Sequence, residues 1–254
     1  MMGILRKIYS ALIYIFLYMP LVVMVVFSFN ASKFSMQWQG ATLGWYSKLF
    51  SNVSLMEAAW HSLIIAVLAA TCSSLLGTLM AMALHRWRFP ARKVIRACLF
   101  VMMMSPDIVI GISLLVLFMS MGLPLGFWTL LMAHITLCVP FVAITVHSRL
   151  LGFDPHVVEA ARDLGAGEYE VFRYVVLPMV FPAVLAGWFL SFTLSIDDVI
   201  ISFFATGPTF EVLPLRIYSM VRLGIKPEVN ALCAIMILIT AVGVFISQRL
   251  LKER

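Results

Sequence analysis

Charged residues are scarce in this sequence and make up only 12% of its 254 residues. A soluble globular domain usually carries about twice that share, so the composition excludes a soluble domain with an ordinary polar surface. Hydrophobic residues instead account for 63% of the chain, and the mean hydropathy is +1.03. The composition therefore predicts an all-α, polytopic membrane protein.

Cysteine is also scarce, with four residues that all lie in apolar runs without CxxC spacing. This pattern indicates neither a disulfide framework nor a metal site, so the cysteines are interpreted as small core residues. They are Cys72, Cys98, Cys138 and Cys233.

The sequence lacks a phosphate-binding loop of the form G-x-x-x-x-G-K followed by Ser or Thr. This absence excludes an ATPase site in the chain. A recognisable set of nucleophile, base and orienting group is missing as well, which predicts that the chain is not an enzyme and has no catalytic residues.

Long apolar runs are abundant. A membrane-spanning helix needs about 20 mostly apolar residues, and six stretches qualify. The first follows Arg6 and Lys7 and is interpreted as a retained signal anchor, because it lacks a small-x-small cleavage site. The predicted spans are residues 8–29, 61–84, 96–119, 127–147, 179–204 and 229–250.

The basic residues predict how these spans are oriented. With six spans, both termini and the loops after the second and fourth spans share one side, which holds thirteen of the eighteen Lys and Arg residues. The positive-inside rule makes that side cytoplasmic. Both termini and the loop of residues 148–178 are therefore predicted to be cytoplasmic, and residues 1–254 to form a single transmembrane domain.

One polar segment, DPHVVEAARDLGAGEYEVFRYVVLP, interrupts the apolar sequence at residues 154–178 and is called the insert below. Its Asp-Pro start suits a helix N-terminus, and the first helix is predicted to run to about Leu164. Gly165 can adopt the left-handed conformation that ends a helix. A second helix is predicted from about Glu168 until Leu177 and Pro178 stop it.

The order of Glu159-Ala160-Ala161, Gly165 and Leu177-Pro178 resembles the EAA loop of permease subunits of type I ABC importers, which have the MetI-like fold. Three further segments are similar to the polyamine branch of that family. They are SPDIVIGISLLVLF at 105–118, SFTLSIDDVIISFFATGP at 191–208 and LPLRIYSMVR at 213–222. The alternative for the insert is an interfacial helical hairpin that lies on the membrane surface.

The resemblance implies a permease that passes spermidine or putrescine across the bacterial inner membrane. It implies as partners a homologous second permease, two copies of a cytoplasmic ATP-binding subunit and a periplasmic binding protein, with no nucleic acid. ATP and Mg would be used by the ATP-binding subunit, so no cofactor is expected in this chain. The residues that it implies for coupling are Glu159, Ala160, Ala161, Gly165, Glu168, Leu177 and Pro178.

Two aromatic residues, Trp45 and Tyr46, lie in the loop between the first two predicted spans, on the side opposite the insert. They are expected either to contact the external binding protein or to belong to an aromatic belt at the lipid headgroups.

Three acidic residues, Asp107, Asp197 and Asp198, fall in predicted spans that hold no deep Lys or Arg. Each charged carboxylate at the bilayer centre costs about 2.5 to 3.5 kcal/mol on insertion scales, so three of them indicate a function. Their counter-charge must be a proton, a neighbouring subunit or a transported cation. A polyamine fits, because it is an extended cation that carboxylates can pair.

Helical spacing places Asp198 on one polar stripe with three serines. In chain order the stripe is Ser191, Ser195, Asp198 and Ser202, at i, i+4, i+7 and i+11. Asp197 projects about 100° away, so both acids can face one narrow path only if the helix is broken. A structural, hydrogen-bonded carboxylate is the alternative for Asp198, and His134 is interpreted as an interhelical hydrogen-bond partner. The predicted substrate pathway comprises Asp107, Asp197, Asp198, Ser191, Ser195, Ser202 and Trp188.

Two alternative functions stay open. In a proton-coupled secondary transporter the acids, and His134 with them, would relay protons. Six spans without visible inverted repeats are few for such a carrier, and the insert would have no purpose there. An ABC permease for another small solute is the second alternative, although the unpaired acids disfavour an anion such as sulfate or phosphate.

Overall fold

The computed structural model describes residues 2–32, 37–152, 154–222 and 227–238. In these ranges every regular element is a helix, and the only β-type pairing is an isolated bridge between Asn30 and Ala41. The all-α prediction is confirmed for this part of the chain. Contacts divide the protein into two compact units, one of residues 58–215 and one of residues 1–57 with 216–254.

The smaller unit contains α1 (Met2–Phe27), α2 (Gly44–Ser51) and a helix at Pro227–Leu238. The side chain of Asn30 shapes the loop after α1, because it accepts from the backbone N–H groups of Ser32 and Gln39. An ion pair of 2.7 Å between Lys48 and Glu228 joins α2 to the helix at Pro227–Leu238. The predicted first span, residues 8–29, corresponds to α1. Residues 239–250 of the predicted sixth span lie outside the described residues.

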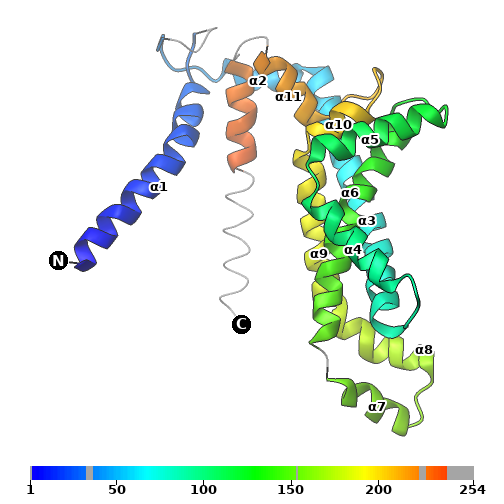
Figure 1. The fold of residues 1–254 in the computed structure, drawn as a ribbon. Coiled ribbons are helices and arrows are strands. Elements are labelled where there is room, and N and C mark those ends of the chain that lie inside the picture. The colour runs from blue at the N-terminus through cyan, green and yellow to red at the C-terminus, as the bar shows by residue number, and fades with distance from the viewer. Residues whose placement is uncertain (1, 33–36, 153, 223–226, 239–254) are drawn as a thin grey trace. The chain divides into compact units, whose positions relative to one another are not determined.

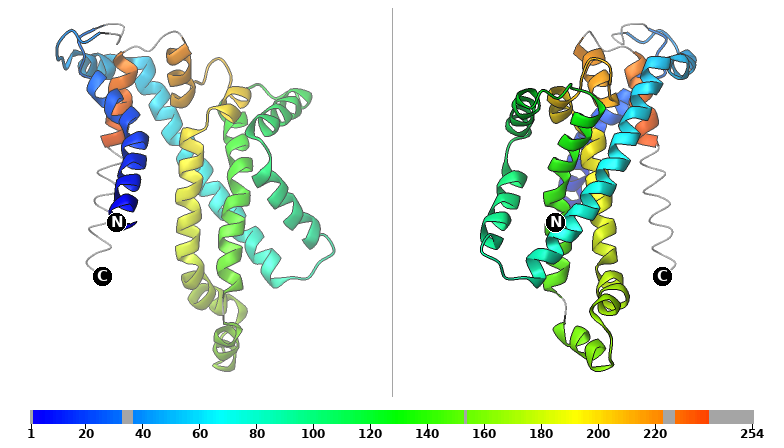
Figure 2. Two further views of the ribbon diagram at one scale, coloured as in Figure 1. Left: turned by 60° about the vertical axis from the view of Figure 1, so that its left-hand side comes forward. Right: turned by 90° about the vertical axis from the view of Figure 1, so that its right-hand side faces the viewer.

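The larger unit is a bundle in which α6 (Phe127–Leu151) packs extensively along α9 (Leu177–Asp197) (Figures 1 and 2). Gly77 and Gly187 let two helices approach α6, since a Cβ atom at either position would lie within 3.2 Å of Val142. The helices are α3 (Val53–Arg86), which begins in the smaller unit, α4 (Arg92–Met104), α5 (Asp107–Ser120), α6 (Phe127–Leu151), α9 (Leu177–Asp197), α10 (Ile200–Ala205) and the start of α11 (Leu213–Arg222).

The predicted third span, residues 96–119, is not one straight helix. It consists of α4 and α5, which are bent by 113° relative to each other. Pro106 lacks an N–H group and forces the preceding residue out of helical geometry, so Ser105 is extended with φ −72° and ψ 139°. The prediction of one unbroken helix is wrong because hydropathy does not register the effect of this proline, and whether residues 96–119 form one bent span stays a prediction.

The predicted fifth span, residues 179–204, is also broken. The helix ends at Asp197, Asp198 is extended with φ −67° and ψ 126°, and α10 begins at Ile200. By length and composition, four helices of the described residues can cross a membrane, or five if α4 and α5 count as one bent span. The six-span topology and the sides of the termini stay predictions.

The insert lies at the end of the larger unit that is opposite α5 and α10 (Figures 1 and 2). It contains α7 (Pro155–Asp163), α8 (Glu168–Glu170) and a π-helical segment, η1 (Val171–Val176), which runs directly into α9.

Candidate functional site

The first half of the insert is a short helix that ends in a left-handed turn at Gly165, as its sequence predicts. This turn is called the elbow below. The Asp154 carboxylate accepts from the N–H of His156 at 3.0 Å and caps α7. At the other end, Gly165 has φ +88°. Its N–H donates to the carbonyl of Arg162, and the next N–H, of Ala166, reaches back to Ala161. This is the arrangement that closes a helix with a left-handed residue, so the predicted break is confirmed.

The second half of the insert differs from the prediction, because Leu177 and Pro178 do not stop a helix. The chain is helical without interruption over Glu168–Asp197, a stretch of 30 residues. The π-helical turns of η1 precede Pro178, which lies in the first turn of α9 and has no N–H to leave unpaired. The wider turn admits the proline ring that an ordinary helix interior would exclude.

Glu168 joins the insert to the body of the larger unit. Its carboxylate accepts from the guanidinium of Arg86, at the end of α3, and from that of Arg162 on α7 at 2.8 Å. All three side chains are about half exposed, so this bridge orients the insert more than it stabilises the fold.

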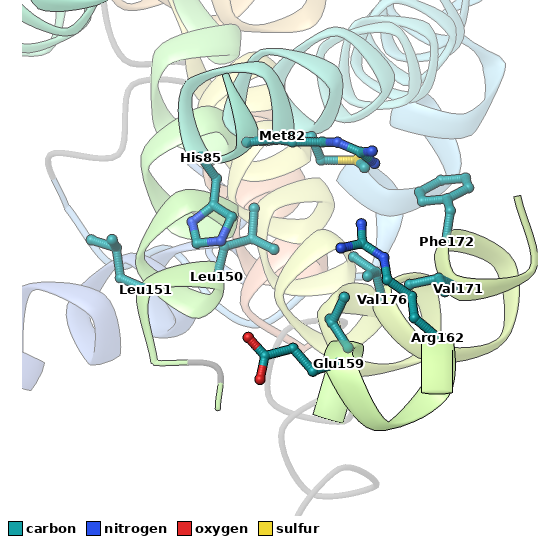
Figure 3. Close-up of a pocket in the computed structure, with 11 residues that line it drawn as sticks. Met82, His85, Leu150, Leu151, Glu159, Arg162, Val171, Phe172 and Val176 are labelled. Carbon is teal, nitrogen blue, oxygen red and sulfur yellow. The ribbon is translucent and has the colours of Figure 1, made fainter. Parts of the chain in front are cut away.

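A pocket of about 470 Å³ lies between the insert and the ends of α3 and α6. Met82 and His85 of α3 lie across it from Glu159 and Arg162 of α7 (Figure 3). Its remaining lining is largely apolar, with Arg86 as a second cation, and comprises Arg86, Leu150, Leu151, Val158, Val171, Phe172 and Val176. The insert is therefore not packed tightly against the bundle.

The surface of the insert carries large apolar side chains that the chain itself does not cover. Leu164 is 89% exposed, Tyr169 71% and Tyr174 73%. Glu159 is also exposed, with an oxygen 3.2 Å from Nδ1 of His156. Large exposed apolar side chains beside charged residues are the kind of surface that protein–protein contacts use.

The predicted polar stripe does not face outward in this conformation. Ser191, Ser195 and Ser202 are 0%, 4% and 0% exposed, and they lie against α6. His134 of α6 lies among them, with Nδ1 2.6 Å from the Ser195 hydroxyl and Nε2 3.0 Å from that of Ser202. The prediction that His134 is an interhelical hydrogen-bond partner is confirmed.

Asp198 is buried beside the same ring, with a side chain 6% exposed and one oxygen 3.6 Å from His134 Nε2. That oxygen accepts from the N–H of Ser202 at 2.7 Å, and the other accepts from the N–H of Ile201 at 3.3 Å. These are the contacts of a structural carboxylate. A pathway role for Asp198 requires this arrangement to open and stays a prediction. His134, Ser195, Asp198 and Ser202 are called the polar cluster below.

The other predicted pathway residues are placed differently. Asp197 is exposed at the end of α9, and Asp107 is exposed in the first turn of α5. Trp188 donates from Nε1 to the Thr71 hydroxyl at 3.1 Å, and its ring stacks on Phe192. The structure therefore separates the two exposed acids from the buried Asp198.

Trp45 and Tyr46 of α2 both contact the chain just after α1. Trp45 donates from Nε1 to the carbonyl of Asn30 at 2.8 Å, and the ammonium of Lys48 lies 5.4 Å from its ring centroid. The Tyr46 hydroxyl lies 2.7 Å from that of Ser28. Both side chains thus help to fix the loop, and their contact with a binding protein stays a prediction.

Known transport proteins resemble this chain over most of its length. The family model described as a binding-protein-dependent transport system inner membrane component matches residues 73–254. The chain is 53% identical over 251 residues to the spermidine/putrescine transport system permease protein PotC of Escherichia coli, an alignment that covers 99% of this chain and 95% of that protein. It is 40% identical over 237 residues to the putrescine transport system permease protein PotI of Escherichia coli, with 90% and 83% covered.

Solved structures share the fold at low sequence identity. A bacterial ABC transporter involved in the import of the acidic polysaccharide alginate matches with a TM-score of 0.75 and 16% identity, over 99% of this chain and 95% of that one. The MetNI methionine ABC transporter matches with a TM-score of 0.61 and 17% identity, over 78% and 95%. At these identities the likeness shows the fold alone.

Proposed function

Because this chain belongs to the family of binding-protein-dependent transport system inner membrane components, we propose that it is the permease subunit of an ATP-driven polyamine importer. The proposed substrate class rests on the 53% identity with a spermidine/putrescine permease across 99% of the chain. The chain is a multi-pass component of the bacterial inner membrane, and its role is transport.

The insert is the element that couples this permease to a cytoplasmic ATP-binding subunit. The uncovered apolar side chains around Leu164 suit such a contact, and the Gly165 elbow directs α7 away from the helix that follows. ATP and Mg²⁺ are used by the ATP-binding subunits, and the permease needs no cofactor of its own. The coupling residues are Glu159, Ala160, Ala161, Gly165, Glu168, Leu177 and Pro178.

The working complex contains a homologous second permease, two ATP-binding subunits and a periplasmic binding protein that delivers the polyamine. In this arrangement residues 1–254 act as a single permease domain with six spans and cytoplasmic termini. Trp45 and Tyr46 belong to the outer surface that receives the binding protein.

Asp107 and Asp197 are the carboxylates that meet the substrate first, because both are exposed while Asp198 is enclosed. Ammonium groups of a polyamine can pair with carboxylates spaced along its length, and weak pairing permits release. Trp188, Ser191, Ser195 and Ser202 are the other residues of the proposed path, and the buried serines join it when the helix break opens.

The test is uptake of radiolabelled spermidine and putrescine into vesicles that contain the reconstituted complex. We expect uptake that requires internal ATP and the binding protein, and that persists when a protonophore collapses the proton gradient. Uptake that follows the gradient and ignores ATP would establish the secondary transporter instead.

Neutralising the exposed acids should slow transport without disturbing the fold. Asp107→Asn and Asp197→Asn preserve side-chain shape, and each is expected to lower initial uptake about fivefold, because an ion pair of this kind contributes about 1 kcal/mol. Glu57→Gln is the control, since Glu57 is an exposed acid of α3 outside the proposed path. Equal uptake in all three variants would show that the carboxylates of Asp107 and Asp197 are not part of the substrate path.

A further inference from the structure

The break between α9 and α10 leaves backbone N–H and carbonyl groups without partners inside either helix. In an apolar surrounding a helix cannot end without partners for its free N–H and carbonyl groups. Asp198 meets part of this demand by accepting from the N–H groups of Ile201 and Ser202 in the first turn of α10. The carboxylate thus caps α10, but it does not by itself fix α10 against α9.

His134 connects α9 to α10. Its ring lies between a serine of α9 and a serine of α10, with Nδ1 2.6 Å from the Ser195 hydroxyl and Nε2 3.0 Å from the Ser202 hydroxyl. The ring is 1% exposed, so these contacts are not exchanged for water. Both sides of the break are therefore held by one rigid side chain of a third helix, α6.

The chemistry of the ring suits this position. A neutral imidazole has one N–H donor and one acceptor nitrogen, and a serine hydroxyl can donate or accept. Either tautomer of His134 therefore satisfies both serines. The Asp198 carboxylate lies 3.6 Å from Nε2, near enough for the ring to limit where the capping group can move.

The two helices that meet at this ring also reach the insert. α6 ends just before α7, and the helix that begins at Glu168 continues to Asp197, a length of about 45 Å at 1.5 Å per residue. One continuous helix therefore connects the second half of the insert to the break.

We propose that His134 is a positioning residue for transport, which bridges Ser195 and Ser202 so that the α9–α10 break keeps one geometry and the Asp198 carboxylate stays on the first turn of α10. This inference rests on the proposed function for its transport readout, while its geometric claim can be measured independently.

The experiment compares four variants in the reconstituted complex. His134→Leu removes both bridges, His134→Gln keeps a donor and an acceptor, and Ser202→Ala removes only the contact to Nε2. Thr136→Val is the matched control, because the Thr136 hydroxyl donates to Met132 within α6 and spans no break. We expect His134→Leu to lower initial uptake about tenfold, from the loss of two buried hydrogen bonds, and His134→Gln to stay within about twofold of wild type. Ser202→Ala should fall between them.

A second readout does not depend on substrate. Spin labels at Leu185 of α9 and Phe203 of α10, both exposed, report the distance across the break in a background without the four native cysteines. The distribution should be narrow in wild type, His134→Gln and Thr136→Val, and broad in His134→Leu. If wild type takes up no polyamine, the proposed function fails while the distances still test the bridge.

Three results would overturn the proposal. One is a His134→Leu protein with normal uptake and an unchanged distance distribution. Another is a His134→Gln protein that assembles but transports as poorly as His134→Leu, which would point to proton transfer by the ring. If His134→Leu fails to accumulate, Ser202→Ala decides, and unchanged uptake in that variant would contradict a bridge across the break.

Discussion

Replacing Gly165 by valine is expected to abolish ATP-dependent polyamine uptake while the chain still accumulates in the membrane. Gly165 has φ +88°, a conformation that costs an L-residue about 1–2 kcal/mol, and more for a β-branched one. A Cβ atom here would meet no heavy atom within 4 Å, so the strain is one of backbone conformation and not of collision.

The strain can be relieved only if the backbone leaves the left-handed region. That change breaks the bonds from Gly165 and Ala166 to the end of α7 and redirects α7 relative to the helix that begins at Glu168. The surface around Leu164 that we propose to contact an ATP-binding subunit would then be displaced. The apolar helices are remote from the elbow, which is why insertion should be preserved.

Gly167→Ala is the matched control for this variant. Gly167 lies two residues further on, has φ −70°, and a Cβ atom there would make only ordinary contact at 3.8 Å. Uptake, copurification of the ATP-binding subunit and membrane abundance should be measured for both variants. Normal ATP-dependent uptake by Gly165→Val would refute the elbow as a coupling element.

Replacing Asp198 by asparagine should lower polyamine uptake by about tenfold to a hundredfold while leaving association with the ATP-binding subunit intact. Both carboxylate oxygens accept from backbone N–H groups of α10, and an asparagine has one oxygen where two are needed. Losing one charge-assisted hydrogen bond in a buried site costs about 1.5–3 kcal/mol. The insert lies at the far end of α9, so docking should be unaffected.

The variant Asp198→Glu distinguishes a role of Asp198 as the cap of α10 from a role of its negative charge in the substrate path. Glutamate keeps the negative charge but moves the carboxylate by one methylene, away from the N–H groups of Ile201 and Ser202. If Asp198 acts as the cap that the structure shows, both variants should transport poorly. Near-normal uptake by Asp198→Glu beside a loss in Asp198→Asn would instead assign Asp198 to the substrate path through its charge. Substrate-stimulated ATP hydrolysis should fall with uptake, and basal hydrolysis should not.

Helix-capping and helix-breaking patterns in the sequence correctly predicted the structure of the first half of the insert and failed for the second half. Asp154 and Gly165 act through bonds to residues within five positions of them, so their roles can be predicted without tertiary information. Pro178 was predicted to end a helix, yet the chain absorbs it with the π-helical turns of η1. Packing of α9 along α6 favours a continuous helix there, and no local pattern indicates that preference.

The sequence by itself determined the membrane class, most of the apolar helices and the helix–elbow at Gly165, because hydropathy and backbone conformation act over a few neighbouring residues. It also indicated His134 and Asp198 as unusual, since polar groups in apolar runs are costly wherever they lie. Only the tertiary structure decided that Asp198 faces inward, that Asp197 and Asp107 face outward, and that His134 spans the break. A helical wheel assumes an unbroken helix, and the hydrogen bonds that hold this break come from residues more than 60 positions apart in the chain.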